Sequence, residues 1–257
     1  MRPACLLLFG LIATACEAGP PRGAGTGPRS LNTAASPAAT PTTGPVVEHW
    51  GSMREVLRDG HTQGRVVLDE VIGPHTVAVG ALAGLAAEIT VVGGTAHLAE
   101  VLDPDSPQGL RVRAPRAGEQ ATLLVLADVP VWSRHVLPAV SDLAELEASV
   151  RALAAASGID VARPFPFRVE GVASDLRLHV LDHSCPISDP SGPRPWRFSG
   201  AGLPTVLVGF HAEGSAGGLT HHGQSSHVHA LVTDRAVSGH LDEVRLAPGA
   251  RLFLPAS

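Results

Sequence analysis

The sequence predicts an α+β protein with two sheet-based subdomains, in which mixed or antiparallel β-sheets carry few helices. Strand patterns separated by turn signals dominate the second half, at 165–171, 175–181, 205–210, 226–233, 240–246 and 251–254. The first half mixes strand and helix patterns, and this order favours two sheet-based subdomains. We place an N-terminal α+β subdomain at 47–160 and a C-terminal, β-rich subdomain at 161–257.

The first half contains signals for two helices and several strands. Ser52 and Glu55 form a capping box and Gly60 is a suitable stop, so a short helix is expected over about 53–59. Ser141 is expected to cap a longer helix with one apolar face. Strands are expected at 77–82 and 123–126, and a hairpin with a two-glycine turn at 89–102.

The N-terminus has the pattern of an export signal. An apolar core follows Arg2 and is too short to span a bilayer, so residues 1–16 are expected to be a lipoprotein-type signal peptide with Cys16 lipidated. An ordinary signal peptide cut near Ala15 is the alternative. Residues 17–46 are rich in Pro, Gly, Ala and Thr, which predicts a disordered linker. We therefore expect an exported protein in the periplasm or at the cell surface, held to a membrane only by a lipid anchor.

Composition excludes several classes of chemistry. The net charge of −5 argues against nucleic acid as a partner. Outside the signal segment Cys185 is the single remaining thiol, so internal disulfides are not expected. The chain has no lysine, since all 19 basic residues are arginine. Schiff-base and pyridoxal chemistry are thereby excluded, and a metal would have to serve as the electron sink in any carbanion reaction.

Three histidines form the most specific pattern in the chain. His227 and His229 lie one residue apart on a predicted strand, so their side chains share one face. The Asp234-Arg235 region predicts a turn, and the returning strand brings His240 near His229 or diagonally across from it. Three converging imidazoles are typical of a catalytic zinc site with an open position. With 13 histidines in the chain, an incidental pair is the alternative.

The residues around this pattern resemble the zinc-binding region of α-acetolactate decarboxylases. The resemblance rests on Val206–Phe210, on His227-x-His229, and on Asp234 through Gly239-His240. Upstream blocks at 51–64, 79–94 and 167–171 agree with that family in order and spacing. The similarity is low in identity and covers nearly all of 48–246, and it implies an acetolactate decarboxylase-like fold.

The resemblance also implies roles for individual residues. His227, His229 and His240 correspond to the three Zn²⁺ ligands, and Glu88 corresponds to the first active-site glutamate. The family's arginine falls on His179 here, while Arg177 lies two residues earlier on the same strand face. The second active-site glutamate, which the family carries in a C-terminal extension, has no counterpart before Ser257.

The implied activity is the conversion of 2-acetolactate to acetoin and CO₂. In this reaction Zn²⁺ would chelate the hydroxyl and keto oxygens, and Glu88 would deliver a proton. Arg177 or His179 would bind the substrate carboxylate. A homodimer is the default expectation from the resemblance. Two alternatives stay open: a related metal-dependent lyase or hydrolase on another small hydroxy-keto acid, and a non-catalytic lipoprotein of the same fold that binds a metal or a small acid.

Overall fold

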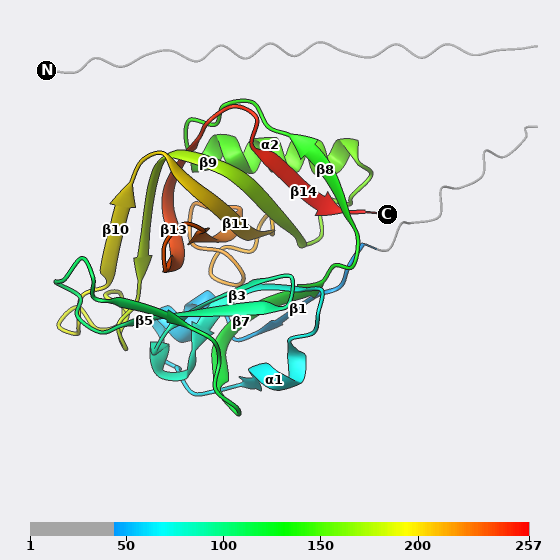
Figure 1. The fold of residues 1–257 in the computed structure, drawn as a ribbon. Coiled ribbons are helices and arrows are strands. Elements are labelled where there is room, and N and C mark those ends of the chain that lie inside the picture. The colour runs from blue at the N-terminus through cyan, green and yellow to red at the C-terminus, as the bar shows by residue number, and fades with distance from the viewer. Residues whose placement is uncertain (1–43, 257) are drawn as a thin grey trace, which may run out of the picture. The chain divides into compact units, whose positions relative to one another are not determined.

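The computed structural model describes residues 44–256 of the 257-residue chain (Figure 1). The predicted signal segment, Cys16 and most of the predicted linker lie outside the described residues. Two antiparallel sheets face one another as layers in Figure 1. None of the helices within 44–256 is long and apolar enough to cross a membrane.

The first sheet comes from the N-terminal part of the described chain. Its strands have the order β1-β7-β3-β4-β5-β6, and β2 pairs with β7. They are β1 Val47–Trp50, β2 Val66–Val67, β3 Thr76–Leu82, β4 Glu88–Val92, β5 Thr95–Val101, β6 Leu110–Arg113 and β7 Gln120–Asp128. The short helical pieces between them are the π-helical turn η1 Arg54–Arg58, α1 Leu68–Val71 and the 3₁₀ turn η2 Ala83–Leu85.

The second sheet begins directly after β7. Its strands have the order β11-β12-β13-β9-β14-β8, and β10 pairs with β9. They are β8 Trp132–Val136, β9 Phe165–Val180, β10 Trp196–Gly200, β11 Leu203–His211, β12 Ser226–Val232, β13 Val237–Leu246 and β14 Arg251–Pro255. The helix α2, Leu143–Ala156, packs against this sheet. The predicted subdomain division at residue 160 stays a prediction.

The long strand β9 joins the second sheet into a closed arrangement. Its first part, 165–173, pairs with β11, and its second part, 173–179, pairs with β13. Since β11 and β13 both pair with β12, the four strands form a ring. The ring fixes β12 and β13 beside the end of β9, and all the residues predicted to be functional except Glu88 lie on these strands.

The register of β11 and β12 shows which face of the second sheet meets the first. Val208 and Phe210 of β11 lie in one apolar cluster with Val77, Val79 and Val125 of the first sheet. Val228 and Ala230 of β12 belong instead to the main core with the apolar face of α2. Because strand side chains alternate, β12 residues 227 and 229 face the first sheet.

The predicted fold class is confirmed, with mostly antiparallel strands and few helices. Half of the predicted capping box is present, since the Glu55 backbone N–H donates to Ser52 Oγ at 3.2 Å, while the Glu55 side chain accepts from the Ser52 hydroxyl and the turn that follows is π-helical. The second helix is capped by Asp142, one residue after the predicted Ser141. The expected strands at 165–171 and 175–181 form the single strand β9. The segment from Cys185 to Gly202, which is rich in Pro, Ser and Gly, contains β10.

Candidate metal centre and active-site pocket

The three predicted histidine ligands meet on two neighbouring strands. His229 of β12 pairs directly with His240 of β13, and His227 lies two residues before His229 on the same face. Each of the three offers a ligand nitrogen, and these atoms all lie within 4.8 Å of one another. Their exposed fractions are 2%, 0% and 6%. We call His227, His229 and His240 the histidine centre.

A glycine beside His240 permits the close approach that builds this centre. A Cβ atom at Gly239 would lie 2.6 Å from the His179 carbonyl oxygen and 2.8 Å from Val180 Cγ2. Both distances are below ordinary contact, so any side chain at this position would push β13 away from β9. Gly239 therefore keeps His240 opposite His179, its partner in the register of β13 and β9.

The imidazoles of the histidine centre are held in the neutral form. Burial lowers the pKa of His227 and His240 well below the usual value, and it lowers the pKa of His229 to about 3. The neighbouring imidazoles add to the effect, because a second positive charge nearby would be unfavourable. A neutral imidazole is the form that binds a metal ion.

The hydrogen bonds around His229 fit a metal ligand. Thr90 Oγ1 of β4 lies 3.1 Å from His229 Nδ1, and Ser238 Oγ lies 3.0 Å from Thr90 Oγ1 and from the Ala230 carbonyl. Since the carbonyl can only accept, the two hydroxyl groups can be oriented so that Thr90 Oγ1 accepts a hydrogen bond from His229 Nδ1–H. The Nε2 lone pair of His229 is then free. Such partners orient metal-bound histidines in proteins.

The remaining polar atoms also fit a shared cation. Nε2 of His227 lies 3.2 Å from Nε2 of His229, so the two nitrogens converge on one point. Within the described residues His227 Nδ1 is a buried atom with no hydrogen-bond partner. Buried polar atoms without partners are costly. A metal ion bound where the two Nε2 atoms converge would satisfy those nitrogens, and His227 Nδ1 would still need another partner.

Glu88 reaches the histidine centre from the opposite sheet. It begins β4 and is 5% exposed, and its Oε2 lies 3.6 Å from His229 Nε2. Burial raises the pKa of Glu88 to about 7, although His179 opposes part of the rise. Glu88 is thus an acid beside the candidate metal, and it can hold or release a proton near neutral pH.

A pocket of about 190 Å³ opens onto these residues. The polar side chains that line it are Glu88, His179, Arg197, His221, His227 and His240. Most of its other lining residues are apolar. The volume is below the roughly 300–1,000 Å³ of pockets that bind drug-sized ligands, so a small molecule fits it.

His179 lies in the pocket and is oriented by a neighbouring carboxylate. The pairing of β9 with β13 shifts register between Leu241 and Glu243, which leaves Asp242 as an extra residue in a bulge. Asp242 Oδ1 lies 2.7 Å from His179 Nδ1. A carboxylate only accepts, so Nδ1 carries the proton and the opposite ring nitrogen is free for another partner.

The structure does not bring Arg177 into the pocket. Its guanidinium donates to Glu243 Oε1 at 3.1 Å, and more than half of its side chain is exposed. The register shift determines its neighbour, because Arg177 pairs with Glu243 while His179 pairs with His240. The arginine that does line the pocket is Arg197 of β10.

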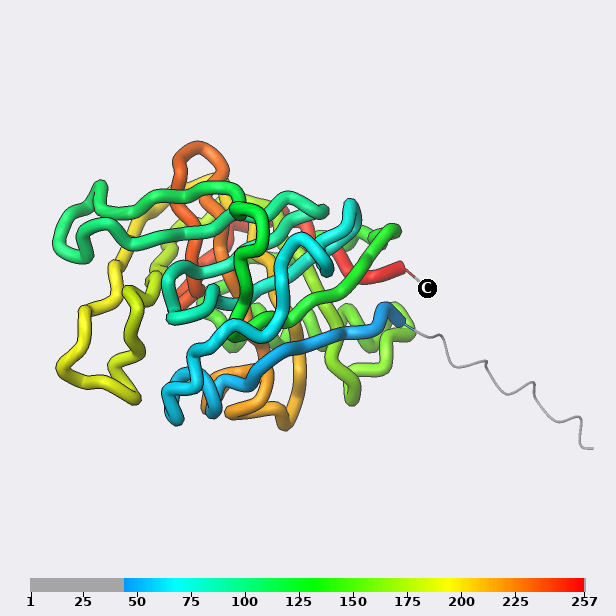
Figure 2. Tube along the Cα trace, turned by 90° about the horizontal axis from the view of Figure 1, so that it is seen from below, coloured from blue at the N-terminus to red at the C-terminus, as the bar shows by residue number. Residues whose placement is uncertain are grey.

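A loop histidine completes the polar side of the pocket. His221 lies between β11 and β12, and its ring centroid is 4.7 Å from that of His240. Two backbone hydrogen bonds tie this loop to the start of η1: Met53 N–H donates to the Gly218 carbonyl, and Arg54 N–H donates to that of Gly217. In Figure 2 the orange loop accordingly lies against the blue segment. His211 instead contacts Ser226 Oγ at 3.3 Å, away from the pocket lining.

Comparison with known proteins relates the fold to one enzyme. No protein-family model and no curated protein sequence matches the chain. The structure of acetolactate decarboxylase from Bacillus subtilis subspecies spizizenii is similar, with a TM-score of 0.64 and 16% identity over 82% of this chain and 86% of that one. The chain shares the fold of acetolactate decarboxylases.

Two further solved structures agree. The alpha-acetolactate decarboxylase from Bacillus subtilis strain 168 has a TM-score of 0.63 and 15% identity, over 82% of this chain and 86% of that one. A Staphylococcus aureus protein of unknown function, described as similar to alpha-acetolactate decarboxylase, has a TM-score of 0.62 and 12% identity, over 80% and 84%. At such identities the similarity establishes the fold alone.

Sequence reasoning missed three residues of the site. Thr90 lies two residues after Glu88 on a predicted strand, and the period of two would have placed it on the same face. Asp242 follows His240 by two residues, and the same rule applies until the bulge intervenes. Arg197 carries no such signal, because its strand follows a segment rich in proline, serine and glycine.

Proposed function

We propose that this protein is a zinc-dependent decarboxylase that converts 2-acetolactate to acetoin and CO₂. The observation that carries the proposal is the juxtaposition of three buried neutral imidazoles with Glu88, whose pKa lies near 7. The fold shared with acetolactate decarboxylases supports it. The size of the pocket suits a small acid.

Zinc is the metal that best fits the donor set. His227, His229 and His240 supply three nitrogen ligands, an arrangement typical of catalytic zinc sites that leave a position open. When bound, Zn²⁺ supplies a Lewis acid that stabilises negative charge on the substrate oxygens. The hydroxyl chain from Thr90 to Ser238 holds His229 in the orientation that such binding requires.

Glu88 is assigned the proton transfer. Loss of CO₂ breaks the bond between the carboxyl carbon and the alcohol carbon and leaves the electron pair on the substrate. The protonated carboxyl of Glu88 donates its proton to the alcohol carbon, which completes acetoin. Glu88 then regains a proton from solvent. Burial raises the pKa of Glu88 in the metal-free protein, and this favours the protonated form from which the step begins.

Arg197 is assigned the binding of the substrate carboxylate, in place of Arg177. Arg197 lines the pocket and pairs in register with His179; its side chain is 69% exposed and donates to Asp242 Oδ2 at 3.4 Å. We expect Arg197→Ala to raise KM roughly 10- to 100-fold, the usual cost of losing a hydrogen bond to a charged group. Arg177→Ala is the matched control and should leave KM within about twofold. If Arg177→Ala has the larger effect, the assignment is wrong.

The direct test combines metal analysis with a product assay. The purified protein is analysed for bound zinc and incubated with 2-acetolactate, and acetoin is measured. One zinc per chain together with acetoin release supports the proposal. Zinc without acetoin would instead favour a related lyase or hydrolase on another small hydroxy-keto acid. A folded protein that binds no zinc would contradict both and favour a non-catalytic module.

A further inference from the structure

Part of the pocket lining comes from an apolar cluster. Met53 and Leu57 at η1, Ala81 of β3, Leu123 of β7 and Leu181 after β9 all belong to this cluster and all line the pocket. They are 3–7% exposed. They are therefore packed together and also border the pocket. We call these five residues the apolar wall.

The apolar wall continues to the mouth of the pocket. Ile187 lies in the loop between β9 and β10, lines the pocket, and is 66% exposed. The same segment ends in β10, which carries Arg197. Trp196 Nε1 donates to the Ser106 carbonyl at 2.9 Å, and Arg194 forms an ion pair with Asp105, so the hairpin between β5 and β6 supports this side. Ile187 is thus an apolar residue at a mouth whose other lining includes a cation.

The shape of 2-acetolactate leaves this wall largely without contacts. Its carboxylate, hydroxyl and keto groups suit Arg197 and the metal, and only two methyl groups remain for the apolar wall. Apolar surface that a ligand removes from water contributes to its binding. An exposed isoleucine at a small pocket has no such contact in the free protein, and a ligand with a longer alkyl group provides one.

We infer that the preferred substrates are 2-hydroxy-3-oxo acids whose alkyl group on carbon 2 is larger than methyl. Leu57 and Ile187 are the specificity-determining residues. This inference rests on the proposed function. The alkyl group lies along the apolar wall while the polar groups face the histidine centre. The pocket volume of about 190 Å³ limits the alkyl group to a short chain.

The test uses unreactive analogues, so it measures binding without turnover. The zinc-loaded protein is titrated by calorimetry with 2-hydroxy-2-methyl acids whose second alkyl group is methyl, ethyl, propyl or butyl. These acids lack the keto group and do not lose CO₂ by this route. Each added CH₂ should lower Kd about fourfold. A Kd that stays flat or rises along the series would overturn the inference.

Two variants locate the effect on the wall. Ile187→Ser should weaken binding of the butyl member about fivefold and change the methyl member by less than about twofold. Val131→Ser is the control, since Val131 is 61% exposed and lies outside the pocket lining. Leu57→Ala should weaken the butyl member about tenfold. If Leu57→Ala fails to fold, Ile187→Ser still tests whether the wall contacts the alkyl group, because the exposed side chain of Ile187 is not needed for folding.

The outcome separates this inference from the proposed function. The matching 2-hydroxy-3-oxo acids are assayed for CO₂ release in parallel. Release from acetolactate without any gain along the alkyl series contradicts only the inference about the wall. Binding that tightens along the series without CO₂ release from any member contradicts only the proposed decarboxylation.

Discussion

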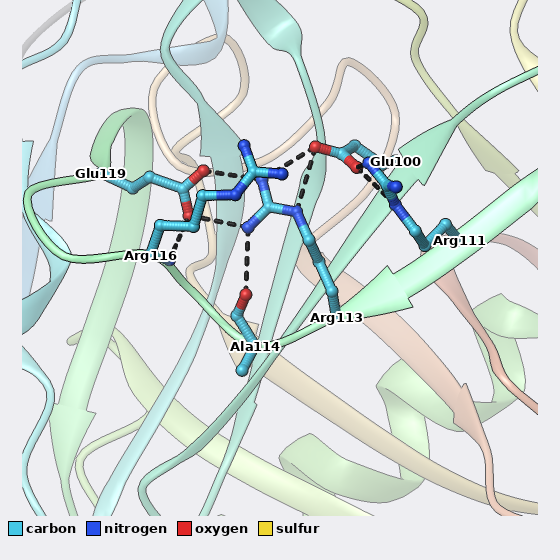
Figure 3. Close-up of polar contacts among 6 residues, drawn as sticks. All are labelled: Glu100, Arg111, Arg113, Ala114, Arg116 and Glu119. Carbon is cyan, nitrogen blue, oxygen red and sulfur yellow. Dashed lines mark hydrogen bonds and ion pairs between the residues drawn. The ribbon is translucent and has the colours of Figure 1, made fainter.

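Two clusters of ionisable side chains in this protein differ in whether their charges are paired. The histidine centre with Glu88 is buried between the sheets, and within the described residues no arginine forms an ion pair there. The second cluster, which we call the arginine network, lies on β5, β6 and the turn before β7 (Figure 3). Its members are Glu100, Arg111, Arg113 and Glu119.

Glutamate shows the difference most clearly. Burial raises the pKa of Glu88 to about 7, whereas hydrogen bonds from Arg113 and Arg111 lower the pKa of Glu100 to about 2. In Figure 3 the Arg113 guanidinium lies between Glu100 and Glu119 and donates to both. A cluster whose charges are all paired needs no further partner. A buried cluster without such pairs indicates a ligand, and this is why the histidine centre and the arginine network are assigned different roles.

The largest effect is expected from removal of a metal ligand. His229→Ala should reduce zinc affinity about 1,000-fold or more, because it removes one of three nitrogens and leaves the other two buried. Zinc affinity is measured by competition with a chelator of known affinity. His75→Ala is the control, since His75 is exposed. Equal affinity of His229→Ala and wild type would show that the histidine centre is not a metal site.

Glu88→Gln separates the acid from the metal. The amide has nearly the same shape but cannot donate the carboxyl proton, so zinc content should stay at the wild-type level while kcat for acetoin release falls about 100- to 10,000-fold. Glu48→Gln, at an exposed position, should change neither. Full activity of Glu88→Gln would exclude Glu88 as the proton donor.

In the metal-free protein, Glu88 and Glu100 should make opposite contributions to the pH dependence of the free energy of unfolding. The pKa of Glu88 is about 7 in the folded state against an ordinary value of 4.5, so between these pH values the unfolded chain releases a proton that the folded protein keeps. The contribution of Glu88 to the free energy of unfolding therefore falls by about 3 kcal/mol as pH rises from 4.5 to 7, whereas the buried histidines, whose folded pKa values are lowered, contribute in the opposite direction.

Glu88→Gln should abolish this loss, and the measurement is urea unfolding across that pH range after removal of the metal. Glu100→Gln serves as the contrast, because the folded pKa of Glu100 is lowered. Its contribution is present above pH 4.5 and is lost as pH falls towards 2. Parallel stability curves for Glu88→Gln and wild type would contradict the raised pKa of Glu88.

The sequence predicts the histidine centre better than it predicts the residues around it. His227, His229 and His240 follow from the period of two along a strand and from one turn, both of which are local. The placement of Arg177 and His179 depends on the bulge at Asp242, and a shift of one residue changes which neighbour a side chain meets. Local patterns do not encode where such a shift occurs.

Contacts between distant segments set the rest of the site and of the fold. Thr90 contacts His229 across 139 residues of chain, and β10 is held by a hairpin of the first sheet through Trp196. Short edge strands such as β1 and β6 were not predicted, because four residues show too few alternations to indicate a strand. The arginine network likewise follows from the pairing of β5 with β6, which the sequence pattern does not specify.

The smallest effect is expected within the arginine network. Arg113 is 14% exposed and pairs with two carboxylates, whereas Arg111 is about half exposed and pairs with Glu100 alone. Arg113→Ala should lower the free energy of unfolding by about 2 kcal/mol, because it leaves two partly buried carboxylates without their shared cation. Arg111→Ala should lower it by less than about 0.5 kcal/mol. Both are measured by urea unfolding at pH 7, and neither should change zinc affinity. Equal losses for the two variants, or a loss of zinc with Arg113→Ala, would contradict the separation of a structural cluster from a ligand-binding one.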